Sequence, residues 1–138
     1  MTEVFDAACH CGAVRFRVRL RQGLSSARRC TCSYCTMRGA VAVSAPLDGV
    51  TFFEGANNLT LYQWGTRIAR HWFCKTCGIY THHQRRSNPE ELGVNMACLE
   101  GVTPWDLPEI RVNDGVDHPS DGAPARVDGV LRYERAPR

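Results

Sequence analysis

The stretch CHCGAVRFRVRLRQ, residues 9–22, joins a pair of cysteines to a run in which apolar and charged residues alternate. Arginines separate the four apolar positions of this run, which are Val14, Phe16, Val18 and Leu20. Because successive side chains of a β-strand point to opposite faces, the pattern predicts a strand with one buried face and one solvated face. We interpret the arginine row as that solvated face rather than as a phosphate-binding surface.

Other short apolar runs recur along the chain, separated by clusters of Gly, Pro, Asn and Asp. They predict strands within residues 40–44, 50–53, 59–64, 67–73, 79–83, 92–99 and 130–135. Helix is expected only as single turns, within residues 32–39 and around residues 104–107. Residues 111–128, rich in Gly, Pro and Asp, are expected to form a long irregular arm on the surface. The sequence therefore predicts a single, mainly β domain over residues 1–138.

Length and charge exclude several classes of protein. The chain has 138 residues, of which 43% are hydrophobic, and this suits one domain with a modest core. A net charge of +3 is too small a basic excess to indicate nucleic acid as a partner. The N-terminal MTEVFDAACHCG has no basic segment followed by an apolar one, and no run approaches the ~20 apolar residues of a membrane span. We expect a cytoplasmic protein without a membrane partner, whose thiols stay reduced.

Seven of the eight cysteines fall into three tight groups, which are CHC at residues 9–11, CTCSYC at residues 30–35 and CKTC at residues 74–77. A structural zinc takes four ligands, and two close pairs from distant segments can supply them. Glycine directly follows two of the groups, as Gly12 and Gly78, where it would allow a tight turn around a metal. The spacing therefore predicts one structural zinc bound by Cys9, Cys11, Cys74 and Cys77.

The remaining group, Cys30, Cys32 and Cys35, supplies three thiolates with no obvious fourth ligand. Three protein ligands and an open position are typical of a catalytic zinc, where water or a substrate thiol can bind. Two alternatives stay open. One is three packed thiols without metal. The other is a second structural zinc completed by a histidine, with the candidates His10, His71, His82 and His83.

Smaller features have simpler interpretations. His82 and His83 are expected on opposite faces of one strand, as polar strand residues, and His10 is expected to face outward. Cys98 is interpreted as a small buried hydrophobic residue. Disulfides are disfavoured, because a bridge across Cys-X-Cys is strained and the expected compartment is reducing.

The segments CHCGAVRFRV, CTCSYCTMRGA, FCKTCGIY and VNMACLEG, in this order, resemble the glutathione-dependent formaldehyde-activating enzyme family. This family is also called the GFA or CENP-V-type domain, and the resemblance runs from about Cys9 to about His118. It implies a β-tent of short antiparallel sheets organised around two Zn²⁺ ions per chain. The structural zinc is implied at Cys9, Cys11, Cys74 and Cys77, and the active-site zinc at Cys30, Cys32 and Cys35.

The resemblance also implies an activity, the condensation of formaldehyde with glutathione to S-hydroxymethylglutathione, which is a carbon-sulfur lyase reaction in reverse. The expected partners are thus a small-molecule thiol and an aldehyde. Candidate residues for the carboxylates of glutathione are Arg28, Arg29, Arg38 and Arg67. Aromatic residues near the cysteines could line a pocket or pack in the core, and these are Tyr34, Trp64, Trp72 and Tyr80.

An alternative from another functional class stays open. In it, both zincs are structural and the domain binds a protein or carries glutathione without catalysis. The amount of zinc per chain, with and without glutathione, would separate the two classes. The oligomeric state is also open, although a dimer is one way to cover the strand edges.

Overall fold

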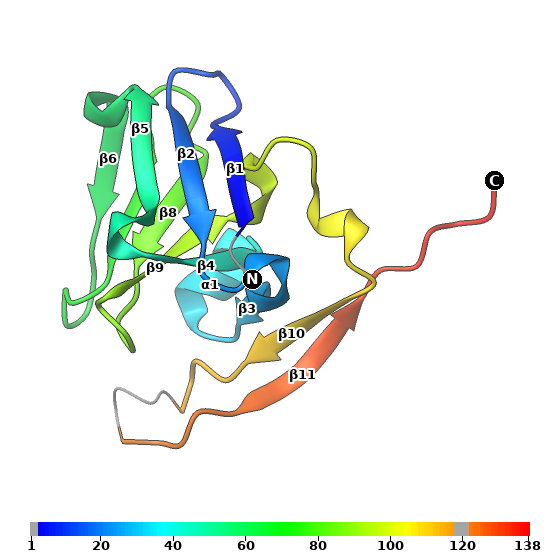
Figure 1. Ribbon diagram of the computed structural model, residues 1–138. Coiled ribbons are helices and arrows are strands. Elements are labelled where there is room, and N and C mark those ends of the chain that lie inside the picture. The colour runs from blue at the N-terminus through cyan, green and yellow to red at the C-terminus, as the bar shows by residue number, and fades with distance from the viewer. Residues whose placement is uncertain (1–2, 118–121) are drawn as a thin grey trace.

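The computed structural model describes residues 3–117 and 122–138, and they form two β-sheets (Figure 1). The smaller sheet has the order β1-β2-β5, formed by β1 (Glu3–Ala8), β2 (Arg15–Leu20) and β5 (Val50–Glu54). The larger sheet has the order β11-β10-β3-β4-β9-β8-β7-β6. Its strands are β3 (Arg28–Cys30), β4 (Ala42–Pro46), β6 (Leu59–Tyr62), β7 (Arg70–Cys74), β8 (Tyr80–Gln84), β9 (Glu91–Asn95), β10 (Glu109–Asn113) and β11 (Val127–Arg132). The mainly β prediction is confirmed.

Helix is limited to short segments in the described chain. The one α-helix, α1, covers Ser33–Arg38, and a 3₁₀ turn, η5, covers Pro104–Asp106, so both expected helical turns are confirmed. Further 3₁₀ turns are η1 (Gly23–Ser26), η2 (Leu47–Gly49), η3 (Ala56–Asn58) and η4 (Met96–Cys98). Within the described ranges, no helix has the length and apolar character that crossing a membrane requires.

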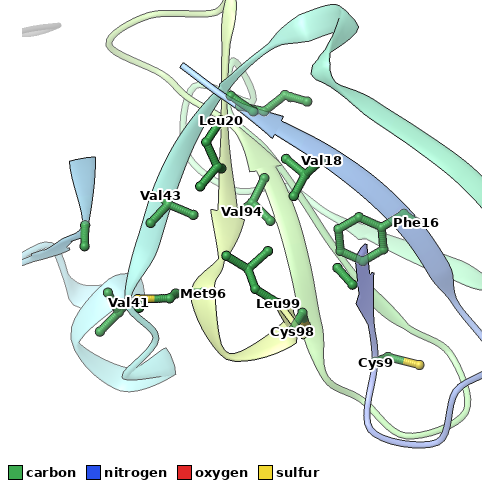
Figure 2. Close-up of a cluster of buried hydrophobic side chains, with 14 of the residues drawn as sticks. Cys9, Phe16, Val18, Leu20, Val41, Val43, Val94, Met96, Cys98 and Leu99 are labelled. Atoms are coloured by element: carbon green, nitrogen blue, oxygen red, sulfur yellow. The ribbon is translucent and has the colours of Figure 1, made fainter. Parts of the chain in front are cut away.

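The core lies between the two sheets and is built on β2. Phe16, Val18 and Leu20 are fully buried, while the arginines between them are exposed, so the predicted alternation is confirmed. Figure 2 shows these side chains directed toward those of Val43 on β4 and Val94 on β9. Truncating a buried phenylalanine such as Phe16 to alanine typically costs about 3–5 kcal/mol.

The arginine row of β2 forms the solvated face that the sequence predicts. Arg17 Nε donates to Asp6 at 2.8 Å, and an Arg19 guanidinium nitrogen lies 3.0 Å from Asp48. These pairs connect β2 to its neighbours β1 and η2. Exposed pairs of this kind contribute little to stability, about 0–1 kcal/mol each.

Several features differ from the sequence-based expectations, including strand β3 (Arg28–Cys30), which was not expected. Strand β1 was not expected, because EVFDAA has only weak alternation, and its pairing with β2 along its whole length forms it. The expected strand at residues 92–99 ends at Asn95, whose side chain accepts a hydrogen bond from Ala97 N at 3.1 Å and starts η4. The arm expected over residues 111–128 begins inside β10, which pairs with β3 in the one parallel pairing among the described strands.

Candidate functional site

Four cysteines lie on the turns of two β-hairpins, one from each sheet, and we call them the four-cysteine cluster. Cys9 and Cys11 lie in the β1–β2 turn, Cys74 is the last residue of β7, and Cys77 lies in the turn that leads to β8. Gly12 and Gly78 follow with φ of 79° and 77°, a backbone region that favours glycine. The tight turns predicted from these two glycines are therefore confirmed.

The sulfur atoms of the four-cysteine cluster fit a tetrahedral metal. All four lie within 4.8 Å of one another, with Cys9–Cys11 and Cys11–Cys74 separated by 3.6 Å and 3.7 Å. Zn–S bonds of about 2.3 Å in a tetrahedron place the sulfurs about 3.8 Å apart, whereas a disulfide requires about 2.05 Å. Val14 N also donates to Cys9 Sγ at 3.3 Å, which stabilises a thiolate. The cluster can hold a metal ion.

The other three cysteines lie where β3 passes into α1, and we call them the cysteine triad. Cys32 is the N-cap of α1, and its sulfur accepts a hydrogen bond from Cys35 N at 3.3 Å. Cys32 N in turn donates to Cys30 Sγ at 3.5 Å. The three sulfurs lie within 4.8 Å of one another. The capping of α1 by Cys32 therefore brings the three sulfur atoms of residues 30–35 together.

The electrostatics of the cysteine triad favour a bound cation. Hydrogen bonds from the Cys30 and Cys35 thiols lower the pKa of Cys32 to about 2, and contacts with Cys30 and Cys32 raise the pKa of Cys35 strongly. Deprotonation of one thiol therefore opposes deprotonation of its neighbours, and the nearby Arg38 guanidinium offsets this only in part. A soft divalent cation such as Zn²⁺ supplies further positive charge, so the donor set fits this metal.

The cysteine triad lines a cavity of about 580 Å³, which we call the triad cavity. This volume lies within the usual range of small-molecule sites. Four arginines on its wall make it basic, and they are Arg85, Arg86, Arg111 and Arg126. Asp114, which also lines the cavity, holds Arg126 at 2.9 Å, and Glu91 holds Arg85 at 2.9 Å.

The segment after β10 packs directly against the cysteine triad. Thr31 N donates to Asn113 O at 3.1 Å, and Gly115 N donates to Thr31 Oγ1 at 2.9 Å. A Cβ atom on Gly115 would overlap the Cys30 sulfur. Glycine is therefore required here by the close approach of the chain, because the residue has no positive φ that would demand it.

His71, from β7, forms the opposite part of the wall and is fixed in one tautomer. Arg38 Nη1 lies 2.9 Å from His71 Nδ1, and a guanidinium can only donate, so Nδ1 accepts and the ring proton is on Nε2. Burial, reinforced by the charge of Arg38, lowers the pKa of His71 to about 4. Arg38 Nη2 also lies 3.7 Å from Cys35 Sγ. Arg38 thus connects a neutral imidazole to the cysteine triad.

Residues 4–111 match the family model for the glutathione-dependent formaldehyde-activating enzyme. The chain belongs to this family. The match begins before the expected Cys9 and ends before the expected His118, which lies outside the described residues. A crystal structure of a protein from Rhodobacter sphaeroides, a structural genomics target, is 62% identical in sequence. The similarity covers 78% of this chain and 98% of that chain, with a TM-score of 0.76.

Part of the triad cavity of this family member lies outside the family match. Asp114, Gly115 and Arg126 line the cavity, and all three follow residue 111, where the match ends. The family match therefore covers the two cysteine groups and the core, while one wall of the cavity belongs to the C-terminal segment of this chain.

The histidines and Cys98 occupy the following places. His10 is exposed, as expected. His82 and His83 lie on opposite faces of β8, as expected: His82 stacks on Trp72, and His83 lines the triad cavity. Among the described residues, no histidine joins either group of possible metal ligands. Cys98 is buried outside both groups, which confirms its interpretation as a small core residue, and burial raises its pKa to about 12.

The four arginines expected near the substrate, which were Arg28, Arg29, Arg38 and Arg67, do not line the triad cavity. Arg28 points into the protein and donates to Ser44 Oγ at 2.8 Å. Arg38 lies behind the cysteine triad, with its guanidinium carbon 3.7 Å from the centre of the Tyr80 ring. Arg67 is exposed on a turn with φ of 57°. We chose these four arginines because they lie near the cysteines along the chain. The arginines that line the cavity are instead brought to the cysteines by pairing between distant strands.

Two of the four aromatic candidates line the triad cavity, and two do not. Tyr34 and Trp64 line the triad cavity, with their ring centres 6.3 Å apart, and Tyr34 also contacts the His71 ring. Trp72 packs instead against His82. Tyr80 is buried and does not line the cavity. Alternation along β7 provided the signal: His71 faces the cavity, so its neighbour Trp72 faces the other way.

Proposed function

We propose that this protein is a zinc-dependent carbon-sulfur lyase that adds a thiol, glutathione, to formaldehyde and forms S-hydroxymethylglutathione. The observation that carries the proposal is that the cysteine triad lines a basic cavity of ligand size, whereas the four-cysteine cluster lies on two hairpin turns outside it. Membership of the family supports the choice of thiol and aldehyde.

Two Zn²⁺ ions per chain belong to this proposal, within a single domain. Cys9, Cys11, Cys74 and Cys77 would hold the structural ion, and Cys30, Cys32 and Cys35 would hold the catalytic ion. When bound at the cysteine triad, zinc would supply Lewis acidity and would lower the pKa of a coordinated thiol.

The residues of the chain would bind and orient the thiol. Glutathione carries two carboxylates, and arginine forms paired hydrogen bonds with carboxylates. Arg85, Arg111 and Arg126 line the triad cavity and are suited to this contact. Tyr34 and Trp64 would exclude water from one side of the cavity.

His71 would act on the aldehyde oxygen. During the addition the thiol loses its proton, sulfur bonds to the formaldehyde carbon, and the former carbonyl oxygen takes up a proton. His71 Nε2 carries the ring hydrogen, because Arg38 occupies Nδ1. A donor held in place before the reaction stabilises negative charge as it develops on this oxygen.

The test is the rate at which formaldehyde and S-hydroxymethylglutathione interconvert at equilibrium, measured by ¹³C exchange spectroscopy with labelled formaldehyde. Thiols add to formaldehyde without a catalyst, so the measurement must compare rates with and without protein. We expect wild type to accelerate exchange and Cys32→Ser to leave only the uncatalysed rate. Binding of glutathione without acceleration would instead identify a thiol carrier and would overturn the proposal.

A further inference from the structure

The C-terminal segment brings one carboxylate, that of Asp114, into the wall of the basic triad cavity. Among the described residues that line this cavity, Asp114 is the only acidic one. Its side chain is 5% exposed, whereas the side chain of Arg126, which it holds at 2.9 Å, is 61% exposed. An exposed arginine samples many rotamers, so a fixed carboxylate beside it restricts where its guanidinium lies.

The carboxylate of Asp114 is fixed by the backbone of its own turn. Its Oδ1 accepts hydrogen bonds from Val116 N at 2.9 Å and from Asp117 N at 3.0 Å. Its Oδ2 accepts from Arg126 Nη2, and Asp114 N donates to Arg126 O at 2.9 Å. One oxygen therefore closes the turn while the other holds the guanidinium.

The same turn is joined to the cysteine triad. Gly115 N donates to Thr31 Oγ1, Thr31 N donates to Asn113 O, and Gly115 packs against the Cys30 sulfur. A short series of contacts therefore sets the position of the Arg126 guanidinium relative to the triad sulfurs. Polar groups at fixed positions in a cavity give it specificity. This arrangement suits a ligand that carries a thiol and, at a matching separation, a negative group.

We propose that Asp114 is a positioning residue that holds Arg126 where it binds a carboxylate of the incoming thiol, so that the triad cavity selects thiols bearing a carboxylate. The inference rests on the proposed function and assigns thiol selectivity to a segment beyond residue 111, where the family match ends. Asp114 and Asp128 both contact Nη2 of Arg126, and the other three N–H groups belong to Nη1 and Nε. Four arginines against one aspartate keep the cavity wall positive.

Binding of two matched thiols to the full chain loaded with zinc tests the role of Arg126. Isothermal titration calorimetry would compare glutathione with its diethyl ester, which keeps the thiol but has no free carboxylate. Wild type should bind glutathione at least about tenfold more tightly than the ester. Arg126→Met should weaken glutathione about tenfold and change ester binding by no more than about twofold. Arg126→Lys, which keeps the charge without the planar fork, should recover part of the loss.

Asp114→Asn tests whether Asp114 acts through Arg126. The asparagine Oδ1 can still accept from the turn amides, but its Nδ2 cannot accept from Arg126. We expect glutathione to bind about 3- to 10-fold more weakly, with a higher KM in the exchange reaction, an unchanged kcat and unchanged ester binding. Combining Asp114→Asn with Arg126→Met should add nothing to the effect of Arg126→Met alone. Asp48→Asn, which breaks the pair with Arg19 on the exposed face of β2, is the matched control.

The outcomes separate this inference from the proposed chemistry. Equal weakening of both ligands by Asp114→Asn would show that Asp114 only shapes the turn, and would overturn the inference. Additive effects in the double variant, or a wild type that binds the ester as well as glutathione, would overturn it too. A wild type that prefers glutathione but does not accelerate exchange would instead overturn the proposed lyase activity and leave the selectivity of the cavity in place.

Discussion

The four-cysteine cluster and the cysteine triad use the same side chain in two different backbone settings. The cluster occupies the turns of two hairpins, one in each sheet, and therefore can join the sheets through a metal. The triad lies at the N-terminus of α1 and lines a cavity. The two groups differ in their backbone setting more than in their number of cysteines, and this difference is the basis of the structural and chemical roles that we propose for them.

The largest expected effect is on the stability of the folded chain, and it should differ between substitutions in the four-cysteine cluster and in the cysteine triad. Cys9→Ser should remove the structural metal and lower stability by several kcal/mol, since binding energy at a structural zinc is folding energy (apparent values about 10–16 kcal/mol in small zinc domains). Cys32→Ser should leave a folded chain with one zinc instead of two. Thermal unfolding and metal content of both variants provide the measurement. Equal unfolding of the two would remove the distinction between the groups.

Gly115→Ala should damage the cysteine triad without affecting the four-cysteine cluster. The new methyl group would overlap Cys30 Sγ, which must move by a large part of an ångström. We expect loss of the triad metal and a fall in exchange rate of about 100-fold or more. Val116→Ala, at the exposed neighbouring position, is the control and should behave as wild type. A Gly115→Ala protein that retains two zincs would show that the contact does not constrain the site.

Removing the His71 side chain should affect turnover and leave both metals bound. His71→Leu should lower the maximal exchange rate about 10- to 100-fold, the usual range for one hydrogen-bond donor or proton-transfer group. His71→Gln, which can place an N–H near the position of Nε2, should recover part of the rate. His82→Gln is the control, because His82 lies on the opposite face of β8. Equal rates for the Leu and Gln variants would assign His71 a packing role.

The smallest effect concerns the pH dependence of stability at His82, away from both groups of cysteines. Burial lowers the pKa of His82 to about 4, against about 6.5 in the unfolded chain. The unfolded state therefore binds an extra proton between these values, so stability is lost as pH falls below about 6.5. The expected loss is about 1.4 kcal/mol by pH 5.5.

Urea midpoints of wild type and His82→Gln at pH 7.5 and pH 5.5 measure this effect. Contributions from the cysteines are common to both proteins and cancel in the comparison. We expect a larger decrease with acid in wild type. Identical decreases would show that His82 gains a proton as easily in the folded chain as in the unfolded one.

Much of the fold was predictable from local patterns. The alternation in β2 fixed which residues are buried, and Gly12 and Gly78 marked the two turns that hold the four-cysteine cluster. Strand β1 was not predictable, because EVFDAA becomes a strand by pairing with β2. The parallel pairing of β10 with β3 could not be predicted from local patterns either, because it joins segments about 80 residues apart.

By itself, the sequence determined the three groups of cysteines, their division into a cluster and a triad, and the buried face of β2. These features depend on residues close together in the chain, where spacing and alternation set geometry directly. Only the tertiary structure decided which arginines meet the cysteine triad, that Arg38 fixes the tautomer of His71, and that Gly115 must lack a side chain. Each of these depends on contacts between distant strands, whose register is set by packing of the whole core.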